Sequence, residues 1–426
     1  MSAVTVGLRE HAWPTEYVLD DATGRALAAS HIIDAAPDPY TPGVWLLAAR
    51  TKVGAATVTV PGGGRVELRI TPKVTIGRLF FLLGYAADPK GWRDDQIDVA
   101  QFEDLLPALA HAFERHTDRA LRQGLLQGYR QAEESAFVVR GRIRHAEQIR
   151  RRHGVTVPVE LEYDEFTTDI TENRLLRAAT DCLLTLPGLP TDVRRRLLHQ
   201  RARLADVSPL IRGRRTPGWH PSRLNARYHS ALHLAGIVLR GASVDHLAGR
   251  TRIDGFLFDM AKVFEDFVTV ALREAMAGRA AAIDATAAGS GAGGYAQLQA
   301  RHHLDEADTV LVKPDFVWYA DGGRPLAVAD AKYKAGKPEG FPGADLYQLL
   351  AYCTVLALSE GHLVYAKGND THASHVVRES GNRIHQHALD LEQPPAGLLA
   401  QIAAIAGSMD GAAAELPPRA SGVSTA

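Results

Sequence analysis

The segment VKPDFVWYADGGRPLAVADAKYK, residues 312–334, combines a sheet-like hydrophobic pattern with three embedded charges. Its two apolar stretches flank Gly322 and Gly323. Adjacent glycines favour a two-residue hairpin turn, because both central positions of a type I′ turn require positive φ. The resulting register pairs residue 317 with residue 328, so the sequence predicts a β-hairpin here.

The same register places two carboxylates opposite one another. Asp315 pairs with Asp330, and directly opposed residues have Cβ atoms roughly 5 Å apart on one face of the sheet. Lys332 follows Asp330 by two positions and therefore shares that face. A turn longer than two residues would shift the register. The sequence thus predicts that two carboxylates and one ammonium group converge.

Opposed like charges destabilise a sheet, so a compensating partner is expected. Mg²⁺ would serve, because it is held by few carboxylates, keeps several waters and binds phosphate oxygens. In such a site the metal activates water and offsets charge on the transition-state phosphate. Lys332 would orient or deprotonate the water, or stabilise the phosphate. The cluster therefore predicts hydrolysis of a phosphodiester bond.

The next segment, GADLYQLLAYCTVLAL at residues 343–358, has the periodicity of a helix. Its predicted apolar face comprises Leu349, Tyr352, Cys353 and Leu356. Gln348 and Tyr352 are spaced i and i+4, so they lie on one side of this helix. We expect the helix to present Gln348 toward the cluster, with an exposed surface position as the alternative.

The composition is that of a globular protein. The chain has 426 residues, of which 46% are hydrophobic and 23% charged, which predicts two or three domains. Its formal net charge of −1 lacks the basic bias of a protein that binds DNA unaided, so a local basic patch or a partner is expected. One candidate basic patch comprises Arg140, Arg142, Arg144, Arg150, Arg151 and Arg152. These arginines would either contact phosphate groups or form a solvent-exposed face.

Several classes of protein are excluded by what the chain lacks. Its two cysteines, Cys182 and Cys353, are too few and too distant for a disulfide framework or a cysteine zinc site. No apolar run reaches the ~18 residues needed to cross a membrane. The N-terminus lacks the features of a signal peptide. We therefore expect a cytoplasmic protein that does not contact membranes.

Patterns along the chain predict four successive segments. These are a β-rich N-terminal domain with helix at 1–135, a mainly helical linking region at 136–245, an α/β domain at 246–408 and a disordered tail at 409–426. Within them we expect a buried helix at 75–86, an amphipathic helical stretch from 99 to about 131, a strand and a basic helix at 137–154, and a flexible loop at 287–294.

Three parts of the charged cluster occur in the order of a known motif. Pro314-Asp315, Asp330-Ala331-Lys332 and the pair Gln348 and Tyr352 resemble the PD-(D/E)xK nuclease motif with its QxxxY extension. Longer blocks resemble McrC, the nuclease subunit of the McrBC modification-dependent (type IV) restriction system, at residues 68–86, 163–184, 256–268 and 330–352. The beginning of the chain, up to about residue 60, matches this family poorly.

This resemblance implies a multi-domain α/β protein whose C-terminal domain is restriction-endonuclease-like, with a central mixed sheet flanked by helices. Glu265 would lie on the helix that opens this domain, and a solvated helix face is the alternative for it. The implied metal ligands are Asp315, Asp330 and Glu265, and the implied catalytic or supporting residues are these three with Lys332, Gln348 and Tyr352.

The resemblance also implies a partner. In the family, a GTP-hydrolysing AAA+ ring of the McrB type recognises modified DNA, and the McrC subunit docks through its N-terminal half, stimulates GTP hydrolysis and cuts double-stranded DNA. The sequence agrees with this division, because it contains no phosphate-binding loop for GTP. Two alternatives stay open, namely a similar nuclease with a different AAA+ partner in phage defence, and a non-cleaving activator or scaffold.

The chain has 18 histidines, and two pairs stand close in sequence. These are His302 with His303, and His385 with His387. We expect both pairs at the protein surface, without a metal.

Overall fold

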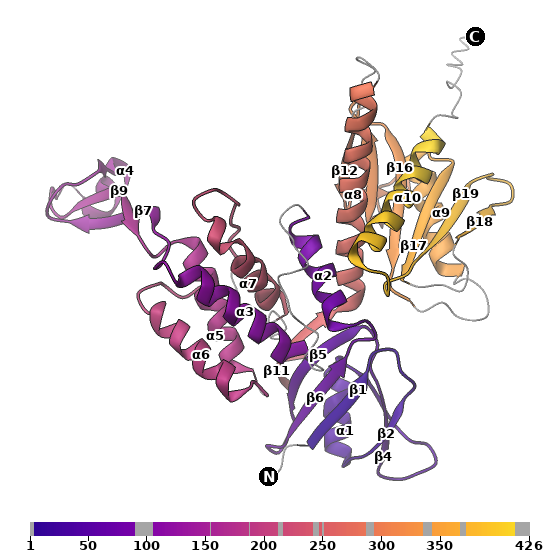
Figure 1. Ribbon diagram of the computed structural model, residues 1–426, viewed down its shortest axis with the longest axis horizontal. Helices are drawn as coiled ribbons and strands as arrows, with labels where there is room; N and C mark the ends of the chain where they lie inside the picture. Colours follow the sequence, from indigo (N-terminus) through magenta and orange to yellow (C-terminus); the bar gives the residue numbers. More distant parts are fainter. Residues whose placement is uncertain are drawn as a thin grey trace. The chain divides into compact units, whose positions relative to one another are not determined.

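The computed structural model describes residues 4–89, 105–153, 155–186, 188–211, 216–241, 247–248, 251–286, 294–334, 343–366 and 372–413, and it mixes strands and helices (Figure 1). Contacts between residues divide the chain into two compact units. The first comprises Met1–Val4, Gly54–Leu68 and Asp95–Leu257, and the second comprises Thr5–Val53, Arg69–Asp94 and Phe258–Ala426. The predicted N-terminal segment thus contributes residues to both units.

The N-terminal residues form strands, as predicted. A five-stranded sheet has the order β1-β6-β5-β11-β10, and a three-stranded sheet has the order β2-β4-β3. The bounds are β1 Val4–Arg9, β2 Thr15–Val18, α1 Asp21–Ala29, β3 Asp34–Pro37, β4 Val44–Ala48, β5 Lys52–Thr59, β6 Arg65–Thr71, β10 Leu247–Ala248 and β11 Thr251–Asp259. Alternate residues Val66, Leu68 and Ile70 of β6 are buried, which is the period of a strand with one face in the core.

Helix α2 (Ile76–Ala87) confirms the buried helix predicted at residues 75–86. It packs on helix α8 (Met260–Thr286) through aromatic side chains. The rings of Phe81 and Tyr85 lie 5.5 and 5.6 Å from the ring of Phe267. These ring contacts hold α2 against α8 within the second unit.

The amphipathic stretch predicted from 99 to about 131 is helical only in part. Helix α3 spans Leu105–Leu121, and residues 99–104 lie outside the described part of the chain. Gly124 follows with a φ of 86°, a conformation that favours glycine and ends the helix. Tyr129 belongs to strand β7 (Gly128–Ala136), which pairs along its length with β9 (Val159–Thr167). Pairing with this distant strand outweighs the local helical period.

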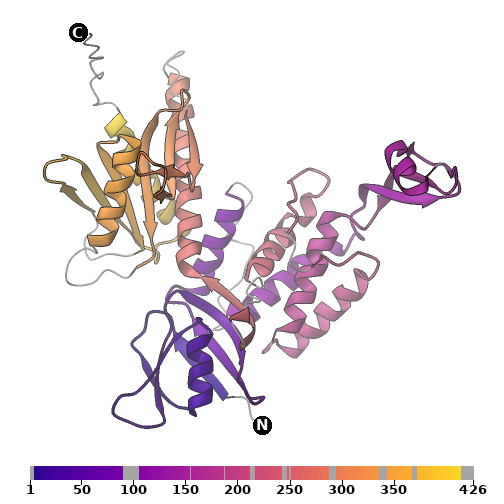
Figure 2. The same ribbon diagram turned by 180° about the vertical axis from the view of Figure 1, so that it is seen from behind.

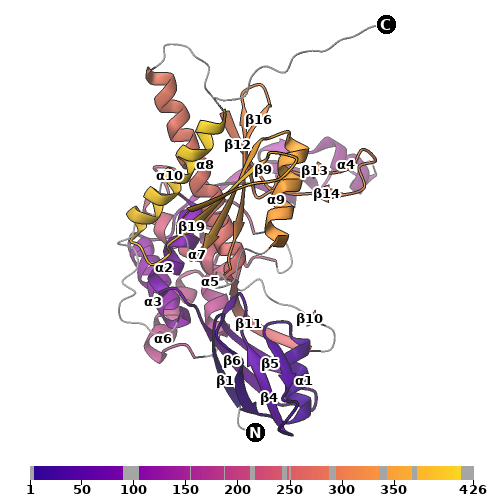
Figure 3. The same cartoon turned by 90° about the vertical axis from the view of Figure 1, so that its right-hand side faces the viewer.

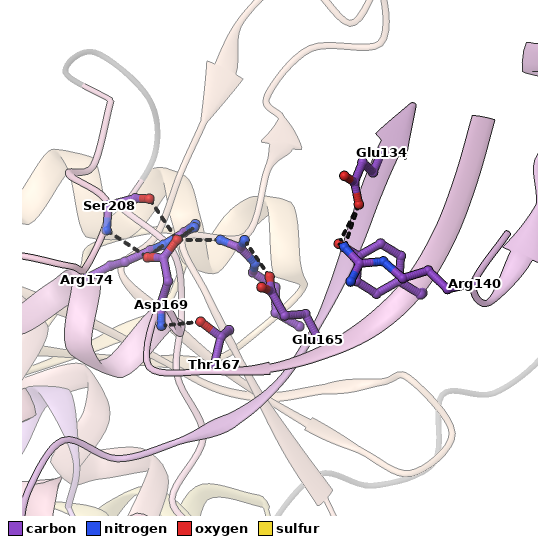
Figure 4. A network of polar contacts seen from close by, with 9 residues as sticks. Glu134, Arg140, Glu165, Thr167, Asp169, Arg174 and Ser208 are labelled. Atoms are coloured by element: carbon purple, nitrogen blue, oxygen red, sulfur yellow. Dashed lines mark hydrogen bonds and ion pairs between the residues drawn. The ribbon is translucent and has the colours of Figure 1, made fainter. Parts of the chain in front are cut away.

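Strands β7, β9 and β8 (Arg142–Ile143) form a small sheet with helix α4 (His145–Arg152). The strand predicted before the basic helix is therefore only two residues long. Four arginines of the candidate basic patch form ion pairs within this module: Arg140 with Glu134, Arg144 with Glu133, and Arg150 and Arg151 with Glu147 (Figure 4 shows the first). These four arginines are therefore paired with glutamates of the same module.

Helices predominate between residues 170 and 241, as predicted, with α5 at Thr171–Thr185, α6 at Thr191–Arg203, η2 at Ala226–Tyr228 and α7 at His229–Gly241. Asp169 joins this helical part to the β7-β9-β8 module (Figure 4). Its carboxylate accepts hydrogen bonds from Arg174 Nη2 at 2.6 Å, Ser208 Oγ at 2.7 Å and Arg130 Nη1 at 2.5 Å. The hydrogen bonds from Arg174 hold the pKa of Asp169 well below its usual range.

A six-stranded mixed sheet forms the core of the second unit, in the order β12-β15-β16-β17-β19-β18. Its elements are β12 Gly294–Leu298, β15 Phe316–Ala320, β16 Pro325–Lys332, α9 Gly343–Leu356, β17 Glu360–Ala366, β18 His372–Val376, β19 Arg383–Leu389 and α10 Pro395–Ala413, with a small pair β13 His302–His303 and β14 Leu311–Val312. Strand β17 runs parallel to β16 and β19, and the remaining pairs are antiparallel. Helices α8 and α10 cover one face and α9 covers the other (Figures 2 and 3).

The predicted hairpin is present, with a longer turn. Ala320 and Arg324 form the last backbone hydrogen bond, so the loop has three residues, and only Gly323 has positive φ. A bulge in β16 beside Tyr319 adds one residue and restores the expected pairing of residue 317 with 328. The face of Asp330 is therefore the predicted one.

The structure describes only a small part of the tail predicted at 409–426 and of the loop predicted at 287–294. Helix α10 continues to Ala413, so residues 409–413 are helical, and residues 414–426 lie outside the described part. Residues 287–293 also lie outside it, and Gly294 begins β12. Among the described residues, no helix has the length and apolar character required to cross a membrane.

Candidate active site

Two carboxylates meet at the open end of the β15–β16 hairpin, away from its turn. Asp315 immediately precedes β15, and its Oδ2 accepts a hydrogen bond of 3.0 Å from the Ala331 amide of β16. Asp330 lies on β16 and is 2% exposed. Burial, and then the negative charge of Asp330, raise the pKa of Asp315 to about 6. Burial likewise raises the pKa of Asp330. The predicted convergence of like charges is therefore present.

Lys332 supplies the positive charge of the cluster. Its Nζ lies 2.5 Å from Asp330 Oδ2 and donates a hydrogen bond of 2.8 Å to Gln348 Oε1 of helix α9. Gln348 Nε2 donates to the Tyr352 hydroxyl at 2.7 Å, and this hydroxyl donates to the carbonyl of Lys313 at 3.3 Å. Although Gln348 is exposed, its amide thus holds Lys332 in place, as expected for a helix that faces the cluster.

Glu265 reaches the cluster through a residue that the sequence did not single out. Gln299 Nε2 donates to Glu265 Oε1 on helix α8 and, at 2.9 Å, to Asp315 Oδ1. Burial, followed by the charge of Asp315 among other causes, raises the pKa of Glu265, which is 21% exposed in its side chain. Glu265 is therefore half-buried beside the cluster and not on a solvated helix face. Gln299 has a φ of 54°, an uncommon conformation for a residue other than glycine.

A cavity of about 450 Å³ opens over these groups, and all its lining residues belong to the second unit. Its lining includes the predicted residues Glu265, Asp315, Asp330, Lys332, Gln348 and Tyr352. It also includes His11, Arg50 and Thr51 from the N-terminal part of the chain, together with Lys313 and Lys334. Cations around buried carboxylates are the arrangement expected for a phosphate-bearing substrate.

Two buried acids anchor the chain directly after the strand that carries Asp330 and Lys332. Asp345 is 4% exposed and accepts hydrogen bonds of 2.8 and 3.0 Å from Lys334 Nζ. Glu10 is 3% exposed and accepts from the Tyr333 hydroxyl at 3.2 Å. Burial raises the pKa of Glu10. These contacts hold the two residues that follow Lys332.

The donor set suits a divalent cation. Among the described residues, Asp330 Oδ2 has the ion pair with Lys332 but no hydrogen bond of regular geometry, although it is buried. Asp315 and Asp330 are oxygen donors close enough to repel one another, and Glu265 lies one bridging amide away. Mg²⁺ prefers such carboxylate oxygens, and its charge would relieve the repulsion.

Comparisons with known proteins find similar chains among solved structures. A solved chain from a Thermococcus gammatolerans assembly of McrB AAA+ hexamers with bound McrC has the same fold, with a TM-score of 0.55 at 17% identity over 95% of this chain and 100% of that one. A second Thermococcus gammatolerans structure, of the McrBC complex, matches with a TM-score of 0.38 at 20% identity over 64% of this chain and 88% of that one. No curated protein matches the chain.

A family model described as McrBC 5-methylcytosine restriction system component matches residues 49–366, which is most of the chain and contains every predicted site residue. This confirms the family that the sequence motifs resemble. The chain therefore belongs to the family of McrBC 5-methylcytosine restriction system components.

Proposed function

We propose that this chain is the Mg²⁺-dependent DNA endonuclease subunit of a McrBC-like, modification-dependent restriction system, and that its six-stranded sheet is a PD-(D/E)xK nuclease domain. The observation that carries the proposal is the cluster of Asp315, Asp330 and Lys332, held by Gln348 at one end of the sheet. A protein that only activates a partner has no use for three charges gathered in a sheet core, because such charges cost stability.

Asp315 and Asp330 would hold Mg²⁺, with Glu265 acting directly or through Gln299. When bound, the cation activates water and offsets negative charge on the phosphate. Lys332 would hydrogen-bond the attacking water or a phosphate oxygen, and Gln348 keeps its ammonium group aimed into the cavity. Arg50 and Lys313 would neutralise neighbouring phosphates of the DNA backbone.

We further propose that the chain docks on a GTP-hydrolysing AAA+ ring that recognises the modified DNA. The Thermococcus gammatolerans assembly contains McrB AAA+ hexamers with bound McrC, which supports a ring partner. The exposed aromatic and aliphatic side chains of the β7-β9-β8 module suit a protein interface, since large exposed apolar groups mark binding surfaces. They include Tyr129, Phe137, Val138 and Phe166, with exposures of 77, 78, 76 and 57%. This proposed surface begins within the predicted segment 1–135 and extends beyond it.

The test is cleavage of DNA that contains 5-methylcytosine by the full chain with a McrB-type partner, GTP and Mg²⁺. We expect cleavage by the wild type, loss of cleavage in EDTA, and a fall on the order of 10²–10³-fold in Lys332→Ala, because a charge that stabilises the transition state is removed. Lys52→Ala is the matched control, since Lys52 Nζ donates to the His31 carbonyl outside the cavity.

The same experiment separates the alternatives. A chain that stimulates the partner's GTPase but cuts no DNA under any of these conditions would be an activator or scaffold. Full cleavage by Lys332→Ala would contradict the assigned site. Cleavage that occurs only with a different AAA+ protein would support the nuclease assignment and contradict the proposed McrB-type partner.

A further inference from the structure

A second cluster of ligand-type side chains lies on strands β17 and β19. It comprises Glu360 and His362 on β17 and His385 and His387 on β19. The expectation of surface positions is wrong for His387, which is 6% exposed, and His385 is only 22% exposed in its side chain. His362 is 1% exposed. No local pattern predicts this cluster, because its two halves lie more than twenty residues apart in the chain.

Strand pairing places this cluster on the other face of the sheet from Asp330. Asp330 pairs with Leu363, and Leu363 packs with helix α9 in the apolar core. His362 is the neighbour of Leu363 in the strand and therefore points to the opposite face. His362 pairs directly with His385 in the parallel register, so their side chains lie together. The cluster is thus separate from the carboxylate site.

The four side chains interact closely. His385 Nε2 lies 2.9 Å from Glu360 Oε2, and His362 Nδ1 lies 3.0 Å from His387 Nε2. The rings of His362 and His385 are stacked with centroids 4.8 Å apart and planes 12° apart. One donor atom from each of Glu360, His362 and His385 lies within 4.8 Å of the other two. Small rotations of these side chains would bring the three donors around one ion.

A second residue orients the buried ring of His362. Its Nδ1 lies 3.0 Å from His387 Nε2, which leaves the Nε2 atom of His362 to serve as a ligand. Ligating histidines commonly have their ring orientation fixed by such a contact through the other ring nitrogen.

We propose that Glu360, His362 and His385 form a site for a transition-metal ion of the Zn²⁺ type, with His387 positioning His362. Two imidazoles and one carboxylate are a donor set that Zn²⁺ accepts, with water in the fourth position. The partial exposure of Glu360 and His385 leaves room for that water. Mg²⁺ prefers oxygen donors and is expected at the other site. The ion would tie β17 to β19 independently of the nuclease chemistry.

The experiment uses the full chain after dialysis against a chelator. We expect titration calorimetry to show one tightly bound Zn²⁺ per chain that excess Mg²⁺ does not displace, and Zn²⁺ to raise the unfolding temperature. His385→Ala should weaken Zn²⁺ binding by at least roughly 100-fold and remove the temperature shift, whereas His387→Gln should weaken it by roughly 10–100-fold. Circular dichroism checks the fold, and Glu360→Gln replaces His385→Ala if that variant fails to fold.

Two controls keep the outcome clear. His303→Ala alters an exposed histidine paired with Asp308 at 3.2 Å and should bind Zn²⁺ as the wild type does. Asp330→Asn should also retain Zn²⁺ binding. Loss of binding in Asp330→Asn with retention in His385→Ala would place the ion at the carboxylate site and overturn the proposal. Absence of tight Zn²⁺ binding in the wild type would also overturn the proposal.

Discussion

Replacing Asp330 with asparagine separates the metal role of the carboxylate cluster from any structural role. The pKa of Asp315 rises from 3.8 to about 6, a cost of about 3 kcal/mol at about 1.4 kcal/mol per pKa unit. Burial is the larger cause, so the charge of Asp330 accounts for a minor share, on the order of 1 kcal/mol. Asp330→Asn removes this repulsion together with the attraction to Lys332, whose net contribution is on the order of 1 kcal/mol because the cost of burying the two charges offsets most of their attraction.

The two terms nearly cancel, so we expect the free energy of unfolding in EDTA to stay within about 1 kcal/mol of the wild type. Mg²⁺ at 100 times its dissociation constant should stabilise the wild type by about 2.7 kcal/mol and the variant by much less. DNA cleavage should fall on the order of 10²–10³-fold or more, because the charge of the metal is lost from the transition state.

Urea unfolding with EDTA and with Mg²⁺, and cleavage with the AAA+ partner and GTP, measure these quantities. Asp321→Asn is the control, since Asp321 lies exposed in the turn of the same hairpin. Unfolding of Asp330→Asn in EDTA would show that the charges serve the fold, and cleavage at the wild-type rate would refute the nuclease site.

Two further predictions concern pH and partner docking. The folded-state pKa of Asp315 lies above its unfolded value, so ionisation of this carboxyl disfavours the folded state. In EDTA the free energy of unfolding should therefore fall by up to about 3 kcal/mol as pH rises from about 4 to about 6. Urea unfolding of Asp315→Asn over this pH range should not show that fall. Mg²⁺ affinity should rise over the same interval, because the ligand must be deprotonated. Phe137→Ser should weaken binding to the AAA+ ring by roughly 30-fold if this side chain is an interface hot spot, while Leu224→Ser, which is 85% exposed in the same unit, should not. Equal partner affinity and GTPase stimulation for both variants would remove the docking surface.

Local sequence determined the hairpin that carries Asp315 and Asp330 and the helix that carries Gln348. Their hydrophobic periods, the paired glycines and the i, i+4 spacing all act over short distances along the chain. A turn one residue longer than predicted did not alter the result, because a bulge beside Tyr319 restored the register. The buried helix at Ile76–Ala87 follows from sequence for the same reason.

Tertiary structure decided which distant residues meet at the site. Gln299 bridges Glu265 to Asp315, and His11 and Arg50 line the cavity, although none of them carries a local signal. Residues 128–136 became a strand instead of a continued helix because β9, which lies outside any local window, supplied backbone hydrogen bonds. His362 and His385 were likewise brought together by parallel pairing. Sequence patterns report the periodicity of one segment, whereas these contacts depend on which segments pair, and that is settled only when the whole core packs.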